Sequence, residues 1–269
     1  TGCSPQPTTS LETFDSESRC SGLCGSSCEI TGLWRNVEGD DADWFVNSGP
    51  TPTLVGTGPS DDITGGGNYV YLEANGSQCA TGATAYLQSS CLLLDKQGTD
   101  SCHLSFYYHM SGANTGSLRL AASEDGGLNW TNLWQVSGRQ GNAWNSAYVS
   151  LVDYSDGTTL QLRLIATKGN GIFGDIAVDH IRLHGSQVLD FPTNLMYVDA
   201  DGDGFGAAPT AILTCLETPP DGFAFNNLDC DDSLPEVNPD AEEIPCNGID
   251  ENCNAATIDD DPILPVPAM

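Results

Sequence analysis

The sequence predicts an all-β fold. A jelly-roll or β-sandwich domain is followed by a small, loop-rich calcium-binding module that is cross-linked by disulfides. Short apolar or alternating runs, separated by Gly, Asn and Asp turns, fill the first two thirds of the chain, and no convincing helical period interrupts them. The last third, from Gln187 to Met269, carries eighteen acidic residues and no Lys or Arg. Eleven cysteines accompany only three methionines, which is typical of an oxidising compartment.

The predicted strands of the first domain are short and lie between turn residues. Thr159–Ile165 shows the alternation best, because Leu160, Leu162 and Leu164 share one face while Gln161 and Arg163 share the other. This pattern predicts a strand with one buried and one exposed face. Many such strands with turns between them predict a sandwich or jelly roll. The other examples are 68–73, 103–109, 117–121 and 147–151.

Composition shifts divide the chain into five segments. The first residues are polar and rich in Pro and Thr, and the last eight contain three prolines, which exclude a helix. We expect a leader or linker at residues 1–13, a jelly-roll domain at 14–186, a linker at 187–196, an acidic metal-binding module at 197–261 and an extended tail at 262–269.

The charge balance excludes several partners. Net charge is −29 with only eight Lys and Arg, so nucleic acid and anionic membrane surfaces are poor partners, since both need basic patches. No apolar run is long enough to span a membrane, and the missing signal peptide fits a mature secreted chain. Thr1-Gly2-Cys3 resembles the end of a bacterial lipobox, in which Cys3 would carry lipid; a plain disulfide cysteine is the alternative.

The most informative run begins at Tyr197, where Asp199, Asp201 and Asp203 alternate with glycines that allow a tight curl. Alternating carboxylates repel unless a cation lies between them, and Ca²⁺ is the hard cation that takes several oxygen ligands. The spacing matches the first half of an EF-hand loop, with Phe205 offering its carbonyl. The match then ends, because Thr210 stands where a bidentate Glu is needed.

The missing oxygens are expected from the segment that follows. Asp229, Asp231 and Asp232 are the nearest supply, and a Cys215–Cys230 disulfide would place them beside the loop. Cys246 and Cys253 form the second expected staple. A second alternating cluster lies between and after these two cysteines, and its candidate ligands are Asn247, Asp250, Asn252, Asn254 and Asp261.

Several fragments of the first domain occur in an order that resembles a MAM domain, the extracellular jelly-roll module named from meprin, A5 antigen and receptor phosphatase mu. They include Asp40-Asp-Ala-Asp-Trp44, Gly49-Pro-Thr-Pro52, Tyr69–Glu73, Leu104–Gly112 and Gly174–Ile181. The resemblance covers about 170 residues. It departs from the family in a cysteine-rich insert and in His180, where Asp is usual. It implies a module of adhesion and assembly rather than an enzyme.

The same resemblance implies a structural cation that joins the first and last strands of the jelly roll. Its ligands would be Asp15 or Glu17, together with Asp41, Asp43 and Asp179. The alternative is that Asp41 and Asp43 cap a turn beside a buried Trp44.

The acidic module resembles the bacterial MopE-type metal-binding repeat, a relative in style of thrombospondin type 3 repeats. The resemblance rests on Asp199–Gly206, Asp229–Asp232, Val237–Ile244 and Cys246–Asn254 in that order. The family name implies copper, but copper favours His, Met or Cys ligands, and this segment has no His. We therefore expect Ca²⁺ as the cofactor. A solvated acidic tail without metal is the alternative.

Together these features predict a secreted or surface-displayed bacterial protein that is non-catalytic and mediates adhesion or extracellular assembly. Its partner would be a protein or glycan at a cell surface, or a second copy in a filament linked through an unpaired cysteine and the apolar tail. The alternative is a carbohydrate-binding module of a larger secreted enzyme. Four histidines, none in an HExxH motif, and the lack of GxSxG argue against a hydrolase.

Overall fold

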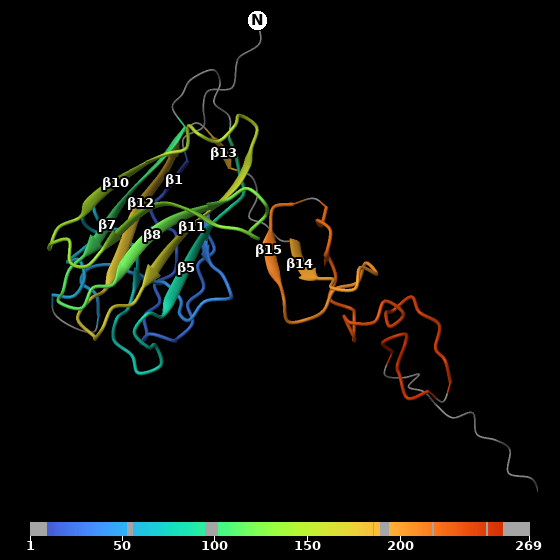
Figure 1. Cartoon of the computed structure of the whole chain (residues 1–269). Helices are drawn as coiled ribbons and strands as arrows, with labels where there is room; N and C mark the ends of the chain where they lie inside the picture. The colour runs from blue at the N-terminus through green and yellow to red at the C-terminus, as the bar shows by residue number, and fades with distance from the viewer. Residues whose placement is uncertain are drawn as a thin grey trace, which may run out of the picture. The chain divides into compact units, whose positions relative to one another are not determined.

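The computed structural model describes residues 10–52, 56–94, 102–184, 186–188, 194–216, 218–245 and 247–254. The described residues form strands, turns and bends without any helix, which confirms the predicted all-β class. The chain divides into two compact units (Figure 1). The first comprises Thr1–Asp125 and Asn129–Phe191, and the second comprises Gly126–Leu128 and Pro192–Met269. Because the described residues form no helix, they contain no helix that is long and apolar enough to cross a membrane.

The first sheet of unit 1 has the order β10-β7-β12-β4-β3, and β1 also pairs with β12. All of these pairings are antiparallel. Short strands that pair with neighbours distant in the sequence are typical of a jelly roll. The bounds are β1 Ser10–Glu12, β3 Phe45–Asn47, β4 Tyr69–Leu72, β7 His103–Met110, β10 Asn145–Ser150 and β12 Ile176–His184.

The second sheet has the order β13-β6-β11-β5-β2, and β8 pairs with both β11 and β9. Its longest strand, β11, lies between β5 and β8, so both of its edges are paired. The bounds are β2 Trp34–Asn36, β5 Thr84–Ser89, β6 Leu92–Leu94, β8 Ser117–Ser123, β9 Thr131–Ser137, β11 Thr159–Thr167 and β13 Ser186–Val188.

One hydrophobic core collects alternate side chains from both sheets. Leu104 and Phe106 of β7 are buried in it, as are Leu160, Leu162 and Leu164 of β11. Alternation places these residues on the inner faces, where burial of a large apolar side chain contributes roughly 1.5–3 kcal/mol. The predicted inward set of β11 is therefore confirmed. Its predicted outward partner Gln161 is buried as well, which corrects the expectation of an exposed outer face at this position.

A β-bulge interrupts β12 between Asp179 and Arg182. His180 lies there with φ of 48°, in the left-handed region that non-glycine residues seldom adopt. Because a bulge adds one residue to one strand only, the side chains beyond it exchange faces relative to an unbroken ladder. Ile181 and Leu183 therefore enter the core, whereas Arg182 is exposed.

The loop 56–67 is fastened to unit 1 by hydrogen bonds to buried acceptors. Thr57 donates its hydroxyl to Asp175, at 2.7 Å, and the Ile63 amide donates to Asp179, at 3.1 Å. The Trp144 indole donates to the carbonyl of Asp61, at 3.0 Å. Both acceptor carboxylates are completely buried, so their partners hold this loop in place.

Unit 2 contains one small sheet, in the order β15-β14-β16, and otherwise consists of turns. The bounds are β14 Asn194–Val198, β15 Ile212–Thr214 and β16 Phe223–Ala224. Among the described residues of this unit, the buried apolar side chains are few: Met196, Ala224 and Val237. So little apolar burial leaves much of the stabilisation of this unit to disulfides and hydrogen bonds.

Three disulfides join described cysteines: Cys20–Cys28, Cys24–Cys79 and Cys230–Cys253. Cys91 and Cys215 are disulfide-bonded as well. The three clustered cysteines near residue 24 thus form disulfides rather than a zinc site. Cys3, Cys246, Asp261 and the tail 262–269, all singled out from the sequence, lie outside the described residues.

Candidate metal centre

The loop that follows β14 is closed by its own first carboxylate. Asp199 accepts the backbone amides of Gly202 at 2.7 Å, Asp203 at 3.1 Å and Gly204 at 3.0 Å. Gly202 and Gly204 have φ of 83° and 95°, which glycine adopts without steric cost. The alternating Asp and Gly residues therefore curl the chain so that several carboxylates face a common centre.

In three carboxylates of the site, one oxygen accepts a hydrogen bond from a backbone amide. Asp201 accepts the amide of Asp203, Asp203 accepts that of Phe205, and Asp229 accepts that of Asp231. The second oxygen of each, Oδ2, is buried and has no hydrogen-bond donor among the described residues. Asp229 as a whole is only 9 % exposed. Buried anionic oxygens without a donor are costly unless a cation binds them.

Two groups of acidic side chains place a carboxylate oxygen of every member within 4.8 Å of the others. Asp199, Asp201 and Asp203 form the first group, all from one loop. The second group joins Asp201 to Asp229 and Asp232, which come from the later segment. The segment around Asp229 thus lies beside this loop, and its role in supplying oxygens to a metal stays a prediction.

Backbone contacts bring the two segments together. Ala207 and Asp229 form a parallel bridge, in which the Asp229 amide donates to the carbonyl of Gly206 at 3.1 Å. The Ala200 amide donates to Asp232 Oδ1 at 2.6 Å. Asp231, also a predicted ligand, instead accepts the amide and the hydroxyl of Ser233.

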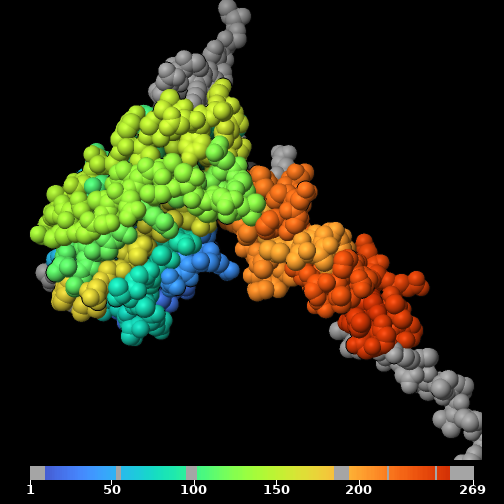
Figure 2. Space-filling view, in the orientation of Figure 1, coloured from blue at the N-terminus to red at the C-terminus, as the bar shows by residue number. Residues whose placement is uncertain are grey.

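The electrostatics of the cluster oppose its ionised form. Burial raises the pKa of Asp201, and so do the neighbouring charges of Asp203, Asp229 and Asp199. Burial likewise raises the pKa of Asp229, together with the charge of Asp203. The surface of unit 2, orange to red in Figure 2, belongs to a stretch of sequence without Lys, Arg or His, so no side chain there neutralises these carboxylates.

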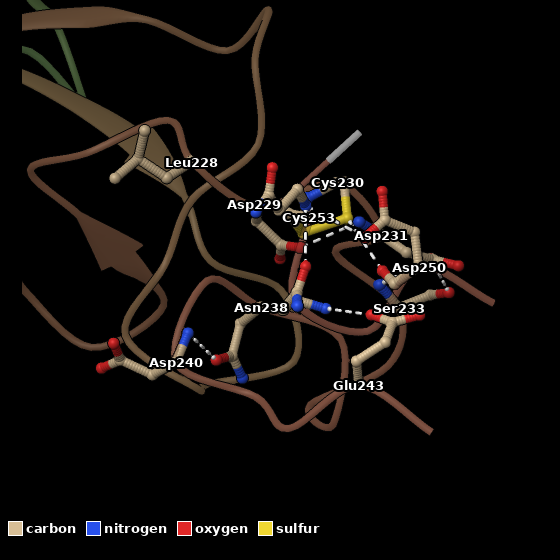
Figure 3. Close-up of a disulfide and its surroundings, with 12 residues drawn as sticks. Leu228, Asp229, Cys230, Asp231, Ser233, Asn238, Asp240, Glu243, Asp250 and Cys253 are labelled. Atoms are coloured by element: carbon tan, nitrogen blue, oxygen red, sulfur yellow. Dashed lines mark hydrogen bonds between the residues drawn. A yellow bond between two sulfur atoms is a disulfide. The ribbon is translucent and has the colours of Figure 1, made fainter. Parts of the chain in front are cut away.

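The predicted disulfide pairing is wrong. Cys230 pairs with Cys253, rather than with Cys215, and Figure 3 shows Asp229, Asp231 and Asp250 gathered around this disulfide. The chain returns to Cys230 because the segment between the two cysteines folds back on itself. The backbone amide of Asn238 donates to the backbone carbonyl of Glu251, at 2.8 Å, and so joins the two halves of this segment. The expected pairing of Cys246 with Cys253 is therefore wrong as well, because Cys253 is bonded to Cys230.

The second predicted cluster is arranged differently from the first. Asp250 and Asn252 both accept the Asn254 amide, and Asn247 accepts the Ile249 amide. Within the described residues these side chains form no group of three acidic or thiol ligands. The hydrogen bonds to the Asn254 backbone amide thus close a turn in this structure. The role of this cluster in binding metal stays a prediction.

Two glutamates near this second cluster were not predicted. Glu251 is only 4 % exposed and accepts the Ile244 amide at 3.0 Å, as well as a bond from the Asn247 side chain. Glu243 has a buried Oε1 without a donor among the described residues. No alternation marks these positions in the sequence, so spacing alone could not have identified them.

The carboxylates predicted to hold a cation in unit 1 are not brought together. Among the described residues of this unit, no three His, Cys, Asp or Glu side chains place their ligand atoms within 4.8 Å of one another. Each carboxylate accepts a backbone amide instead: Asp15 from Asn68, Glu17 from Thr31, Asp41 from Thr84, Asp43 from Cys28 and Asp179 from Ile63. Asp41 and Asp43 precede the completely buried Trp44, as the capping alternative requires.

Large aromatic residues of unit 1, which could otherwise stack on a sugar ring, mostly pack against other aromatic side chains. Trp134 contacts Phe106 and Tyr108 with ring centroids 5.2 Å apart in both pairs, and Trp144 lies edge-on to Tyr69 at 5.9 Å. Tyr107 is 38 % exposed. The hairpin turn at Asp125 holds itself together, since Asp125 accepts bonds from Ser123 and Asn129. Its role is therefore structural.

The architecture defines an all-β sandwich module joined to a small acidic unit with clustered carboxylates. Residues 13–187, more than half of the chain, match the family model "MAM domain, meprin/A5/mu", and the chain belongs to this family. Residues 229–260 match a second family, MopE-type, described as a "Putative metal-binding motif". Both resemblances predicted from the sequence are confirmed. The loop of Asp199–Asp203 lies before the second match.

Relatives of the chain contain MAM domains. It is 37% identical to Neuropilin-1a of Danio rerio over 143 residues, which cover 52% of this chain and 15% of the relative. It is 38% identical to MAM domain-containing protein 2 of Mus musculus, over 58% of this chain and 21% of the relative. The chain thus spans about a fifth or less of these proteins. Among solved structures, the K2 adhesin domain of Lys-gingipain aligns with a TM-score of 0.43, 17% identity, and coverage of 65% of this chain and 99% of that one.

Proposed function

We propose that this chain is a calcium-dependent, non-catalytic protein of the extracellular space, whose MAM domain mediates adhesion or assembly. One observation carries the calcium part. Asp201, Asp203 and Asp229 converge from two segments, and each has a buried oxygen that lacks a donor among the described residues. No basic side chain in unit 2 compensates for them. A bound cation supplies the missing positive charge.

The donor set favours Ca²⁺ over other ions. Ca²⁺ takes six to eight oxygen ligands at roughly 2.3–2.6 Å in flexible geometry, whereas zinc and copper prefer imidazole or thiolate. Unit 2 has no histidine, and its cysteines Cys215, Cys230 and Cys253 are in disulfides. The proposed ligands are the carboxylates of Asp199, Asp201, Asp203, Asp229 and Asp232, with the Phe205 carbonyl.

Bound calcium would hold the shape of unit 2. The ion joins the loop after β14 to the segment that begins at Asp229, and this unit buries few apolar side chains. A site filled at a hundred times its Kd adds roughly 2.7 kcal/mol to the free energy of unfolding. That is a large share of the roughly 5–15 kcal/mol typical of a domain.

Adhesion at a cell surface is supported by the family and by the disulfides. Two MAM relatives carry a glycosylphosphatidylinositol anchor in their names, and disulfides persist in oxidising compartments. The partner we propose is a protein or glycan at such a surface, or another copy of this chain. The apolar tail proposed for a filament falls outside the described residues.

Calorimetric titration of the calcium-stripped chain tests the metal site. We expect Asp229→Asn to weaken calcium binding and to remove most of the rise in melting temperature that calcium produces. Asp221→Asn is the matched control, because Asp221 is an exposed carboxylate of the same unit outside the cluster. Equal affinities for the two variants, or no calcium in the native protein by elemental analysis, would refute the site.

The adhesive function is tested with beads coated with the chain. We expect the beads to cluster, or to bind cells, in calcium and to separate in EDTA, and the Asp229→Asn beads to behave in calcium as wild-type beads do in EDTA. A glycan array with and without EDTA distinguishes a sugar ligand from a protein partner. Beads that neither cluster nor bind cells or glycans would contradict the proposal.

A further inference from the structure

Two of the four histidines of the chain lie side by side on the outer face of the first sheet. His103 of β7 and His184 of β12 are direct cross-strand partners. Their imidazole rings are stacked, with centroids 4.1 Å apart and an interplanar angle of 20°. Tyr148 of β10 continues the stack on the far side of His103, at 4.3 Å. Figure 1 shows β10, β7 and β12 as neighbouring strands.

These side chains face away from the core. Leu104 and Leu183, the neighbours of the two histidines along their strands, are buried, whereas both histidines are partly exposed and Tyr148 is 64 % exposed. The imidazoles are therefore accessible from outside the sandwich. An ion can reach them without any movement of the sheet.

The bulge in β12 is what creates this pair. Before the bulge Val178 is opposite Tyr108, and after it Arg182 is opposite Ser105, so the register has shifted by one residue. In the register without this shift, His184 would face Cys102, which is buried in the core. The strained backbone at His180 thus places the second imidazole on the outer face beside His103.

The spacing of the two rings suits a shared ion. Zinc binds imidazole nitrogens at roughly 2.0–2.1 Å, so two nitrogens on one ion lie about 3–4 Å apart. The stacked rings, with centroids 4.1 Å apart, have nearly parallel planes, so both side chains rotate about χ1 and χ2 before one nitrogen of each points at the same ion. Their partial exposure leaves room for this rotation. Each imidazole has two nitrogens, so one can coordinate while the other keeps a contact with its surroundings.

We propose that His103 and His184 form a binding site for a divalent transition ion of the zinc, nickel and copper class, with the remaining coordination positions open. Imidazole is a preferred ligand of these ions, whereas the carboxylate cluster of unit 2 suits calcium. The two sites therefore select different ions. The open positions allow a further ligand from a partner molecule to complete the coordination.

The charge state of His184 is compatible with coordination. Burial lowers the pKa of His184, and the nearby His103 and Arg182 lower it further. Neutral imidazole is the form that binds metal.

Nuclear magnetic resonance of the intact chain tests the site directly. Zn²⁺ is added in the presence of saturating calcium, which occupies the carboxylate cluster. We expect the ring signals of His103 and His184 to shift together with one saturation curve, while those of His109 and His180 stay in place. No shift of the pair at a several-fold excess of Zn²⁺, or an equal shift of His180, would overturn the proposal.

Variants measured by calorimetry provide the second arm. We expect His184→Gln to weaken Zn²⁺ binding by roughly a hundredfold, since one ligand alone loses the advantage of chelation. His180→Asn is the matched control on the same strand, because Asn accepts the left-handed backbone there, and it should bind Zn²⁺ like the wild type. Wild-type affinity in a folded His184→Gln would refute the site. If that variant does not fold, the ring signals of the wild type decide the question.

Discussion

Asp201 and Asp229 belong to different segments of unit 2, yet a carboxylate oxygen of each lies within 4.8 Å of the other, in a group that also contains Asp232. Both residues also have a buried Oδ2 without a donor among the described residues. Like charges so close together in a unit without basic residues destabilise it unless a cation binds. Under the proposed function, this relationship links the folding of unit 2 to its calcium supply.

The Cys230–Cys253 disulfide should support the metal site, because Cys230 adjoins Asp229. Replacing both cysteines with Ser opens a loop with a sequence separation of 23, which costs about 3 kcal/mol in the chain-entropy estimate. We expect weaker calcium binding, measured by calorimetry, as well as a lower melting temperature. The control replaces Cys20 and Cys28, where stability should fall with calcium affinity unchanged. Unchanged affinity in the Cys230/Cys253 variant would separate the disulfide from the site.

Replacing Asp179 tests whether the carboxylates of unit 1 accept backbone amides only or also bind a cation. It accepts the Ile63 amide from the loop 56–67 and is completely buried, so Asp179→Asn should lower the free energy of unfolding by about 1–3 kcal/mol. The number of calcium ions bound per chain should stay the same. Equilibrium dialysis measures that number, and the loss of one ion would show that unit 1 also holds a cation.

Asp40 should make unit 1 less stable as the pH rises. Burial raises its pKa from 3.8 to about 7, although the Tyr86 amide bonds to it. Between these values the folded state holds a proton that the unfolded state lacks, so the free energy of unfolding falls as pH increases from about 4 to 7.

In Asp40→Asn, the fall in the free energy of unfolding across this pH range should be smaller by on the order of 1–2 kcal/mol. This figure already includes a reduction for solvent screening. Urea unfolding at the two ends of the window measures it. Glu38→Gln, an exposed neighbour, should leave the slope as it is in the wild type. An unchanged slope in Asp40→Asn would contradict the burial of its charge.

His180 should tolerate only residues that accept a left-handed backbone. With φ of 48°, a β-branched side chain clashes with its own backbone, so His180→Val should cost about 1–2 kcal/mol. His180→Asn should cost much less, because Asn adopts this conformation more readily. Thermal unfolding of the two variants compares them, and equal melting temperatures would show that the bulge is not strained.

The sequence by itself determined the properties that depend on neighbours along the chain. Alternation in Thr159–Ile165 predicted the buried leucines of β11, and the Asp and Gly spacing from Asp199 onward predicted the curled loop. Motif order identified both families. These features are local, since a strand alternates every second residue and a carboxylate closes a turn within a few residues.

Only the tertiary structure decided which distant residues meet. It paired Cys230 with Cys253, placed Asp229 beside Asp201, buried Gln161 and directed the carboxylates of unit 1 to backbone amides. It also shifted β12 by one residue, which brought His184 to His103. Such pairings depend on how the chain returns to itself, and one inserted residue reverses the face of every side chain beyond it, so no local pattern contains them.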